Sequence, residues 1–560
     1  MLANEDTEQQ FSEFLHNEIL QNVMAIKNFN KYSSNQAFGE QINLVTEELV
    51  QRIREWMDYY QPMVETDEQL DIQYQGLINR IVKRYHAENE VVTQFPAHFR
   101  LLSPYDKIAY RLVEELATNA VKYASGGTIS LKIDVHDDAI FIISENDCLQ
   151  TEKSLGYGLK NMSKKIFAIN AGSSSLKFQL LSMPDESLLV KGIFEKIGLK
   201  EGIFKIEFEG QKEKELLAIP SHQFAVDYLL NFLLERKLIA SLDEVDGVGH
   251  RVAHGGESFD DSALIDEQVL SIIEKLSFLA PSHNPVNLVG IRAFQKALPE
   301  TGQVAVFDTS FHQSLSEAYY LYPLSWEYYH KYGLRKYGFH GTSHKYIAQK
   351  VKEIWEGQGE TAEHLKIINC HLGNGASICA IKNGQSVNTS MGFTPLAGLM
   401  MGSRSGDIDP MILPFLLEQE KLSAQQLSDV LNKESGLLAI SQLSNDLRDV
   451  LEACDRGDEK ASLAVNMFVN RIAQTIASYI TDLDGLDALV FTAGIGENSA
   501  LIRSLVVQKL NCLGLSLNQA ANEQGQLFIQ NSQSQAKILI LPTNEELMIA
   551  QDTMRLLDFK

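Results

Sequence analysis

Two segments of the chain share a design that few folds can accommodate. Each is an apolar strand that enters a turn of small residues and leaves as a second strand: "FAINAGSSSLKFQLL" at 167–181 and "IINCHLGNGASICAI" at 367–381. Small turn residues let backbone N–H groups approach phosphate oxygens, and the hydroxyls of Ser173, Ser175 and Ser377 add donors. Two such hairpins, far apart in one chain, predict a duplicated domain whose halves hold the phosphates of one nucleotide from opposite sides.

Length, charge and cysteine content limit the class of protein. A chain of 560 residues is too long for one hydrophobic core and predicts roughly three to five domains. The net charge of −24 argues against nucleic acid as the main partner, because phosphate backbones bind basic surfaces. No apolar run approaches the ~20 residues of a membrane span, so we expect a cytoplasmic protein with no membrane segment. The cysteines form no CxxC pair and fit a reducing compartment; they are Cys148, Cys370, Cys379, Cys454 and Cys512.

Three regions differ in their residue patterns. Apolar residues recur at helical spacing on both sides of "NKYSSNQAFG", which predicts a helical hairpin within 1–63 that pairs with a second copy. Residues 64–161 read as mixed α+β, with a helix at 105–123 and strands at 128–135 and 139–145. From 162 to 560, strands and helices alternate as in a large α/β protein.

Long motifs in the third region identify a family. "GHRVAHGGESF", "RKYGFHGTSHKYIA", "MGFTPLAGLMMGSRSGDIDP", "VFTAGIGENS" and "PTNEELMIAQDT" join the two hairpins to make residues 162–560 resemble acetate kinase over its whole length. The resemblance implies a duplicated actin-like ATPase (RNase H-like) fold with half-domains at about 162–310 and 311–560. It also implies a homodimer and reversible transfer of the ATP γ-phosphate to acetate, giving acetyl phosphate and ADP, with Mg²⁺ or Mn²⁺.

Arginine suits such a reaction, because a planar guanidinium binds carboxylate and phosphoryl oxygens with paired hydrogen bonds. By the resemblance, Arg251 binds the acceptor carboxylate, and Arg404 and His340 stabilise the transferring phosphoryl group. Asp308, at the end of a predicted buried strand, matches a catalytic position. Since acetate is already ionised and needs no base, we interpret Asp308 as a positioning and electrostatic group. His283 and His371 are second choices, and His250, His254 and His344 are expected to be ordinary core or surface histidines.

The remaining site residues are also assigned by the resemblance. The metal positions are Asn170 and Glu545. The nucleotide positions are Ser173, Ser175 and Lys177 in the first hairpin; His371, Leu372, Gly373, Asn374 and Gly375 in the second; and Asp446, Leu447, Arg448, Gly494, Ile495, Gly496, Glu497 and Asn498 for the nucleoside.

The predicted pocket for the acyl methyl group departs from the family pattern. Branched aliphatic side chains are usual there, but this chain has Ala253 and Ser282 beside Pro395. Smaller side chains predict either a looser pocket that also takes propionate or a pocket refilled by neighbours. One methylene is worth about 1–3 kcal/mol of discrimination, so the preference between acetate and propionate stays open.

The first 161 residues resemble sensor histidine kinases of the quorum and competence type. "FLHNEILQNV" places His16 as the phosphoacceptor, and "VEELATNAVKYA" and "GYGLKNM" place Asn119 at Mg²⁺–ATP and Gly156 and Gly158 in a lid. The acidic residue usual after the histidine is Asn17, and "SENDCLQ" lacks an expected glycine. We therefore expect a truncated, degenerate kinase joined at Met162, whether by nature or by an accident of joining, and a response regulator as partner only if His16 is active.

Overall fold

The computed structural model describes residues 70–84, 90–95, 128–136, 139–146 and 163–557, and single positions between 110 and 121. The chain divides into two compact units, Met1–Met162 and Ser163–Lys560, which are described separately below. The predicted hairpin with His16 lies outside the described residues. So do Asn119, Gly156 and Gly158, the positions assigned to a histidine-kinase ATP site.

The described part of the first unit is a helix packed on a small sheet. Strand β2 (Thr128–His136) pairs in parallel with β1 (Glu90–Gln94) and antiparallel with β3 (Ala139–Asn146), at the two predicted strand positions. Apolar residues at helical spacing on α4 (Leu70–Arg84) join residues at alternating strand positions in one core. They include Tyr74, Leu77, Ile78, Ile81, Ile129, Leu131 and Ile133.

The second unit begins with an eight-stranded sheet in the order β10-β11-β9-β4-β5-β6-β7-β8. Strands β11, β9 and β4 are parallel, and β5 and β6 continue the sheet antiparallel. The first Gly/Ser-rich turn joins β4 to β5. The strands are β4 (Lys164–Gly172), β5 (Ser175–Met183), β6 (Ser187–Glu195), β7 (Gly202–Phe208), β8 (Gln211–Leu217), β9 (Val245–Val252), β10 (Ala263–Leu264) and β11 (Gly302–Phe307).

The second sheet repeats this pattern. Its order is β14-β13-β12-β15-β16, with β16, β15 and β12 parallel and β13 and β14 antiparallel. The second hairpin joins β12 to β13, at the place that the first hairpin takes in the first sheet. The duplication predicted from the two hairpins is thus present in the strand order. The strands are β12 (Lys366–Leu372), β13 (Ala376–Lys382), β14 (Gln385–Thr389), β15 (Ala488–Thr492) and β16 (Lys537–Ile540).

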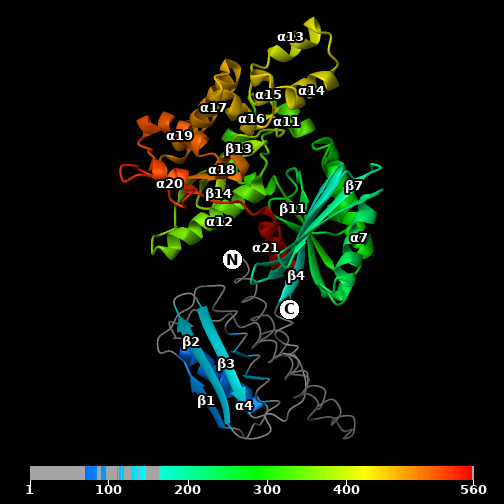
Figure 1. Cartoon of the computed structure of the whole chain (residues 1–560), viewed down its shortest axis with the longest axis vertical. Coiled ribbons are helices and arrows are strands. Elements are labelled where there is room, and N and C mark those ends of the chain that lie inside the picture. Colours follow the sequence, from blue (N-terminus) through cyan, green and yellow to red (C-terminus); the bar gives the residue numbers. More distant parts are fainter. Residues whose placement is uncertain are drawn as a thin grey trace, which may run out of the picture. The chain divides into compact units, whose positions relative to one another are not determined.

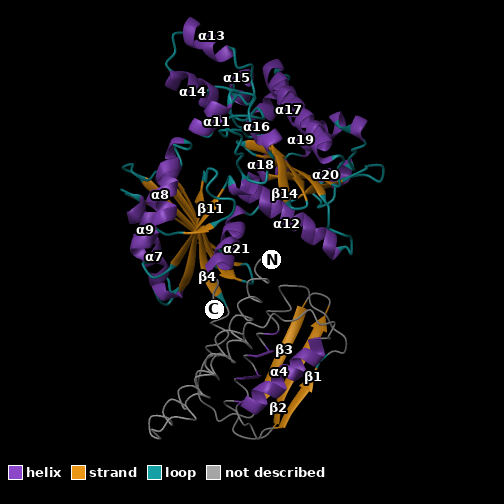
Figure 2. Cartoon of the chain, turned by 180° about the vertical axis from the view of Figure 1, so that it is seen from behind, coloured by secondary structure: helices purple, strands orange, loops and turns teal. Residues whose placement is uncertain are grey.

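Helices cover both sheets (Figure 1). Figure 2 shows α7, α8 and α9 together on one side of the first sheet and α21 on the other. The helices of the first half are α7 (His222–Glu235), α8 (Glu267–Lys275), α9 (Asn284–Ala297), α10 (Glu317–Tyr320) and α11 (Trp326–Tyr332). The later helices are α12 (Gly341–Gly357), α13 (Ile412–Gln419), α14 (Ala424–Lys433), α15 (Gly436–Ser441), α16 (Leu447–Asp455), α17 (Glu459–Leu483), α18 (Ala493–Asn498), α19 (Ala500–Lys509), α20 (Gln519–Glu523) and α21 (Glu545–Leu557).

The last helix, α21, returns to the first sheet. It packs on β4, β9 and β11, and an added Cβ at Gly249 would stand 2.2 Å from Thr553 Oγ1 and 2.5 Å from the Ile549 side chain. Glycine at 249 therefore lets helix and strand approach closely. One buried apolar cluster contains residues of β4, β11, α12, β12, β15, β16 and α21. The two halves consequently share a core, and α12 and α21 lie within it.

Among the helices that the structure describes, none combines the length and the apolar character needed to cross a bilayer.

Candidate active site

The ends of three adjacent parallel strands bring the first predicted site residues together. Asn170 lies near the end of β4, Arg251 near the end of β9, and Asp308 directly after β11. Arg251 Nη2 forms an ion pair with Asp308 Oδ2, and its Nη1 lies 3.5 Å from Asn170 Oδ1. Parallel strands end at one edge of a sheet, which is why three residues distant in sequence meet here.

Asp308 is a buried carboxylate held from several sides. It is 1% exposed, and Thr342 Oγ1 donates to its Oδ1 over 3.1 Å while Arg251 occupies the other oxygen. Its backbone N–H donates to Val252 O over 3.0 Å, and Gly341 N–H donates to its carbonyl over 2.9 Å. The aspartate is therefore fixed to both β9 and the start of α12.

Arg404 lies in the loop before α13. An added Cβ on Gly375 would be 3.5 Å from Arg404 Nη1 and 3.8 Å from the His340 ring. The second hairpin turn, Arg404 and His340 therefore lie next to one another. Within the described part of the chain Arg404 makes no ion pair; its Nη1 donates to Pro395 O over 3.3 Å. Burial lowers the pKa of Arg404 from its ordinary value, and a guanidinium stays cationic in proteins at neutral pH. A cation without a carboxylate partner is suited to bind an anion.

His340 precedes α12 in a left-handed conformation, with φ 57°. Its ring stacks on His371 at 4.2 Å between centroids, and its Nδ1 lies 2.9 Å from Ser377 Oγ. Burial, then His371 and His344, and then the cations Arg251 and Arg404 lower the pKa of His340 well below its ordinary value. His340 is therefore neutral at pH 7 and can donate a hydrogen bond without carrying charge.

The other histidines of this region are tied into a hydrogen-bond network. His344 Nε2 is 2.9 Å from Ser377 Oγ and its Nδ1 is 2.8 Å from Asn369 Nδ2, while His371 Nδ1 is 2.8 Å from Ser343 Oγ. Burial lowers the pKa of His371 to about 4, and a small opposing effect comes from Asp308. His283 lies directly before α9, and partial desolvation of its ring, followed by the charges of Arg251 and Arg404, lowers its pKa.

The start of α21 brings a second carboxylate to the site. Burial, and then the charge of Asp308, raise the pKa of Glu545 to about 7, while Arg251 acts in the opposite direction. The exposed Lys177 of β5 reaches the neighbouring Glu546, with Nζ 3.4 Å from Oε1. Near neutral pH Glu545 is therefore only partly ionised, and it lies close to the Arg251–Asp308 pair.

The second hairpin turn is held close to the Arg404 loop. Gly373 N–H donates to Gly375 O over 3.1 Å, and Gly402 N–H donates to Asn374 O over 3.1 Å. An added Cβ on Gly402 would stand 1.8 Å from Asn374 Oδ1, so the loop depends on glycine there.

Two further segments carry the predicted nucleoside positions. Glu497 Oε1 accepts from Ala493 N–H over 2.8 Å and from Thr543 N–H over 3.3 Å, which joins "GIGEN" to the segment before α21. Asp446 caps α16, and hydrogen bonds from Arg448 lower its pKa to about 2. The Arg448 side chain is 86% exposed. Gly494 is exposed, with nothing within 4 Å of an added Cβ.

The predicted acyl-pocket residues have different surroundings. Ala253 is buried directly after β9, and its N–H donates to Asn287 Oδ1 over 3.1 Å. Pro395 is partly buried and bonded to Arg404. Ser282 is exposed in the turn before α9, next to His283. His250 and His254 are buried, as expected for core histidines.

Sequence reasoning missed several supporting residues. Thr342 and Ser343 stand within the quoted "GFHGTSHKY", so their nearness to His340 was a usable signal. Arg503 had no such signal. Its guanidinium is 2% exposed and donates to Gly496 O and Glu497 O over 2.9 Å, and to Asn522. Burial lowers the pKa of Arg503 to about 10. It satisfies carbonyl groups at the end of α18.

Comparisons with known proteins agree with this geometry. Residues 165–551 match the model of the Acetokinase family. An acetate kinase of Bacillus cytotoxicus is 53% identical over 394 residues, which cover 70% of this chain and 98% of the relative. A propionate kinase of Citrobacter rodentium is 53% identical over 395 residues, which cover 70% of this chain and 97% of the relative.

Solved structures give the same result. The crystal structure of Porphyromonas gingivalis acetate kinase matches with a TM-score of 0.67 and 42% identity, over 70% of this chain and all of that one. A propionate kinase of Francisella tularensis matches with the same TM-score, identity and coverage. The chain belongs to the acetokinase family and is accordingly a phosphotransferase with a carboxyl group as acceptor.

Proposed function

We propose that the enzyme transfers the γ-phosphate of ATP reversibly to acetate, giving acetyl phosphate and ADP. The observation that carries this proposal is the meeting of Arg251–Asp308, Arg404 and neutral His340 beside the second glycine turn. Acetate and the γ-phosphate are both anions, so their approach needs fixed cations and hydrogen-bond donors. The acceptor oxygen is already ionised, and no residue has to remove a proton.

The proposed roles follow from charge and position. Arg251, oriented by Asp308, binds the acetate carboxylate, and Arg404 faces the equatorial oxygens of the transferring phosphoryl group. His340 donates a hydrogen bond to the same oxygens and stays neutral. Asp308 acts by holding Arg251 and receiving the Thr342 hydrogen bond, and it transfers no proton. Such preorganised groups stabilise charge that develops in the transition state.

For the nucleotide, we propose that the two hairpins hold the phosphates. Ser173, Ser175 and Lys177 contribute from the first half and residues 371–375 from the second. Residues 446–448 and 494–498 hold the nucleoside, with Arg503 and Glu497 fixing the latter segment. We infer that the halves form the duplicated actin-like ATPase fold and close on the nucleotide.

A divalent cation fits the residues present. Asn170 and Glu545 offer the hard oxygen ligands that Mg²⁺ or Mn²⁺ prefers, and Glu545 lies close to Asp308. Among the described residues no group of three or more His, Cys, Asp or Glu side chains could hold a metal alone. This suits an ion that keeps waters and substrate oxygens as ligands. When bound, the cation supplies positive charge to the phosphates.

A second substrate, propionate, is favoured by Ala253. Its short side chain lies two residues after the proposed carboxylate-binding Arg251, and propionate kinases are among the relatives at 53–54% identity. We propose that the pocket accepts both acids.

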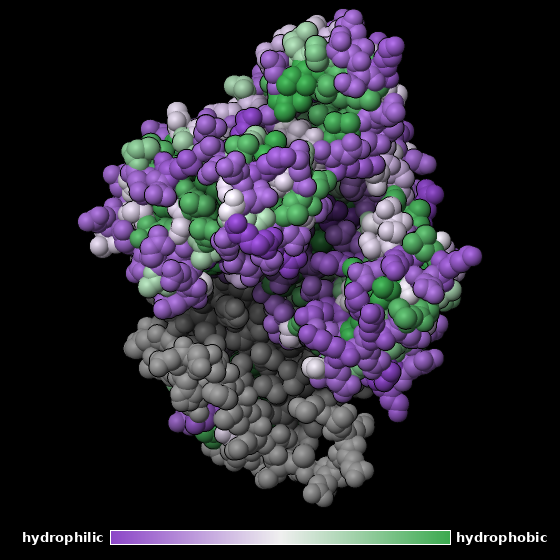
Figure 3. All heavy atoms as spheres, turned by 45° about the horizontal axis from the view of Figure 1, so that its top comes forward, coloured by the Kyte–Doolittle hydropathy of each residue, from purple (hydrophilic) through white to green (hydrophobic). Residues whose placement is uncertain are grey.

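Exposed apolar residues support a homodimer. Helix α13 buries none of its residues, and Figure 3 shows an apolar patch at the top of the molecule, where Figure 1 places this helix. The patch includes Ile408, Met411, Ile412, Phe415 and Leu417, of which Met411 is 70% and Phe415 62% exposed. Apolar patches of this kind mark protein interfaces.

We also propose that the protein is cytoplasmic. Its net charge is acidic, and the buried cysteines Cys370 and Cys379 are free thiols.

We propose that residues 1–161 are a degenerate fragment of a sensor histidine kinase. The motif departures at Asn17 and Asp147 carry this proposal, and a response regulator is a partner only if His16 is phosphorylated.

Replacing Asp308 with Asn should lower kcat for acetyl phosphate formation by about 10²–10⁴-fold, because Arg251 loses its charged partner. Asp246→Asn is the matched control, since Asp246 binds Lys164 over 3.1 Å at the other end of β9. Steady-state assays with acetate and ATP, with circular dichroism to verify folding, measure the effect. Near-normal turnover in Asp308→Asn would contradict the assigned role.

Replacing Ala253 with Val should narrow the acyl pocket. We expect kcat/KM for propionate to fall about tenfold or more relative to that for acetate, because each methylene contributes about 1–3 kcal/mol. The ratio of the two substrates in one preparation is its own control. An unchanged ratio would show that Ala253 does not limit the size of the acyl group.

The dimer can be tested by light scattering. We expect a mass of twice the 62.8 kDa of one chain, and Phe415→Asp should shift it toward the monomer. A monomeric wild-type protein at micromolar concentration would exclude the dimer.

Autophosphorylation can be measured in the Asp308→Asn background, where transfer to acetate is suppressed. With ATP labelled at the γ-phosphate, a degenerate kinase should incorporate no more label than the matched variant that also carries His16→Gln. Acid-labile label that disappears with His16→Gln would contradict the proposal and make the first unit an active kinase.

A further inference from the structure

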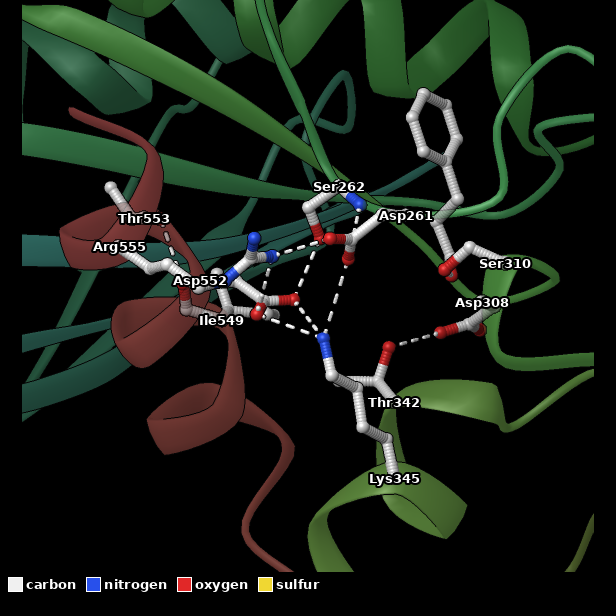
Figure 4. Close-up of polar contacts among 11 residues, drawn as sticks. Asp261, Ser262, Asp308, Ser310, Thr342, Lys345, Ile549, Asp552, Thr553 and Arg555 are labelled. Carbon is white, nitrogen blue, oxygen red and sulfur yellow. Dashed lines mark hydrogen bonds and ion pairs between the residues drawn. The ribbon is translucent and has the colours of Figure 1, made fainter. Parts of the chain in front are cut away.

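A cluster of charged side chains lies outside the proposed catalytic residues, where three segments meet (Figure 4). Asp552 of α21 is 3% exposed, and both its carboxylate oxygens lie 2.8 Å from Lys345 Nζ of α12. Arg555 Nη2 lies 3.1 Å from Asp552 and 2.8 Å from Asp261, in the loop before β10. Ser262 Oγ donates to Asp552 over 2.7 Å. The cluster joins α12, α21 and the first half.

Both helices in this cluster begin at the active site. Helix α12 starts directly after His340, and its Thr342 donates to Asp308. Helix α21 starts with Glu545. Lys345 follows Thr342 by three positions and Asp552 follows Glu545 by seven, spacings that place each pair on one helix face. Figure 4 shows Thr342 pointing to Asp308 and Lys345 pointing to Asp552.

We propose that Lys345 and Asp552 are positioning residues that lock α12 to α21 and so set the placement of Thr342 and His340 against Asp308. The inference rests on the proposed phosphoryl transfer and adds residues that touch no substrate. Apolar helix contacts alone are compatible with small sliding motions. A carboxylate that is bound by a lysine, an arginine and a serine allows only one register of α21 against α12.

Stability alone is a weak reason for such a cluster. Desolvation of buried charges opposes much of their mutual attraction, and apolar substitutes of similar volume are often as stable. Buried ionic groups are better explained by the single arrangement that they impose, and both helices here carry active-site residues at their first turn. The contact between Arg555 and Asp261 extends this fixation to the loop before β10.

The expected kinetic signature is a split between kcat and KM. A small displacement of the α12 start misplaces Thr342 and His340 relative to the transition state, while the nucleotide hairpins and Arg251 remain intact. Lys345→Met should therefore lower kcat by about 10- to 100-fold and leave KM for acetate and ATP within about twofold. Asp552→Asn should act in the same direction.

Lys537→Met is the matched control. Lys537 pairs with Glu360 over 2.7 Å, just beyond the other end of α12, and its side chain is 26% exposed against 24% for Lys345. A variant that only loosens α12 would behave like this control. We expect kcat of Lys537→Met to stay within about twofold of wild type, because a half-exposed pair contributes little.

The double variant Lys345→Met/Asp552→Asn keeps the test decisive should Asp552→Asn fold poorly. Both substitutions remove the same contact between Lys345 and Asp552. The kcat of the double variant should therefore be no lower than that of the less active single variant. Wild-type kcat in Lys345→Met, or an equal loss in Lys537→Met, would overturn the inference. A wild-type protein without transfer to acetate would instead overturn the proposed function, so the two failures are distinguishable.

Discussion

The buried ion pair between Arg251 and Asp308 is the contact on which the site depends. Isolated in the interior, the Asp308 carboxylate would be strongly destabilised, and Arg251 and Thr342 compensate it from two elements. The pair exists because β9 and β11 are adjacent and parallel, so that Arg251 pairs with Val306 in the register and Asp308 follows one residue beyond the strand. Sheet topology, not sequence proximity, therefore creates the site.

Duplication explains why the site has two sides that differ in chemistry. Each sheet places a hairpin at the same topological position, but the first carries serines and Lys177 while the second carries His371 and a glycine turn against Arg404. The two are joined by α12 and α21, which lie in the apolar cluster shared by both sheets. Gly249 permits the close approach of α21 to β9. The halves are thus connected by packed helices whose first turns form part of the site.

The features that could be predicted from the sequence are those that depend on local motifs and residue types. The hairpins and the duplication were predicted because motif and residue type are visible in the letters. Arg251, Asp308, His340 and Arg404, which the motifs singled out, lie close together in the structure. Sequence did not predict that α21 packs on the first sheet, because Gly249 and Thr553 are far apart in the chain. Arg503 was missed because its acceptors are backbone carbonyls, which any sequence possesses. The exposure of Ser282 likewise depends on a loop conformation that no pattern specified.

The charges of the site explain how a chain of net charge −24 can bind two anions. Arg251 is largely neutralised by Asp308, and the exposed Lys177 is paired with Glu546. His340 and His371 are neutral at pH 7, because desolvation lowers the pKa of both rings. In the described site, positive charge is therefore concentrated on Arg404, while Glu545 lies close enough to Asp308 at the sheet edge for their charges to interact. A divalent cation at that edge would complete the charge balance. Arg404 and such a cation would attract the phosphates more effectively than a diffuse basic surface, which makes the overall acidity compatible with phosphoryl transfer.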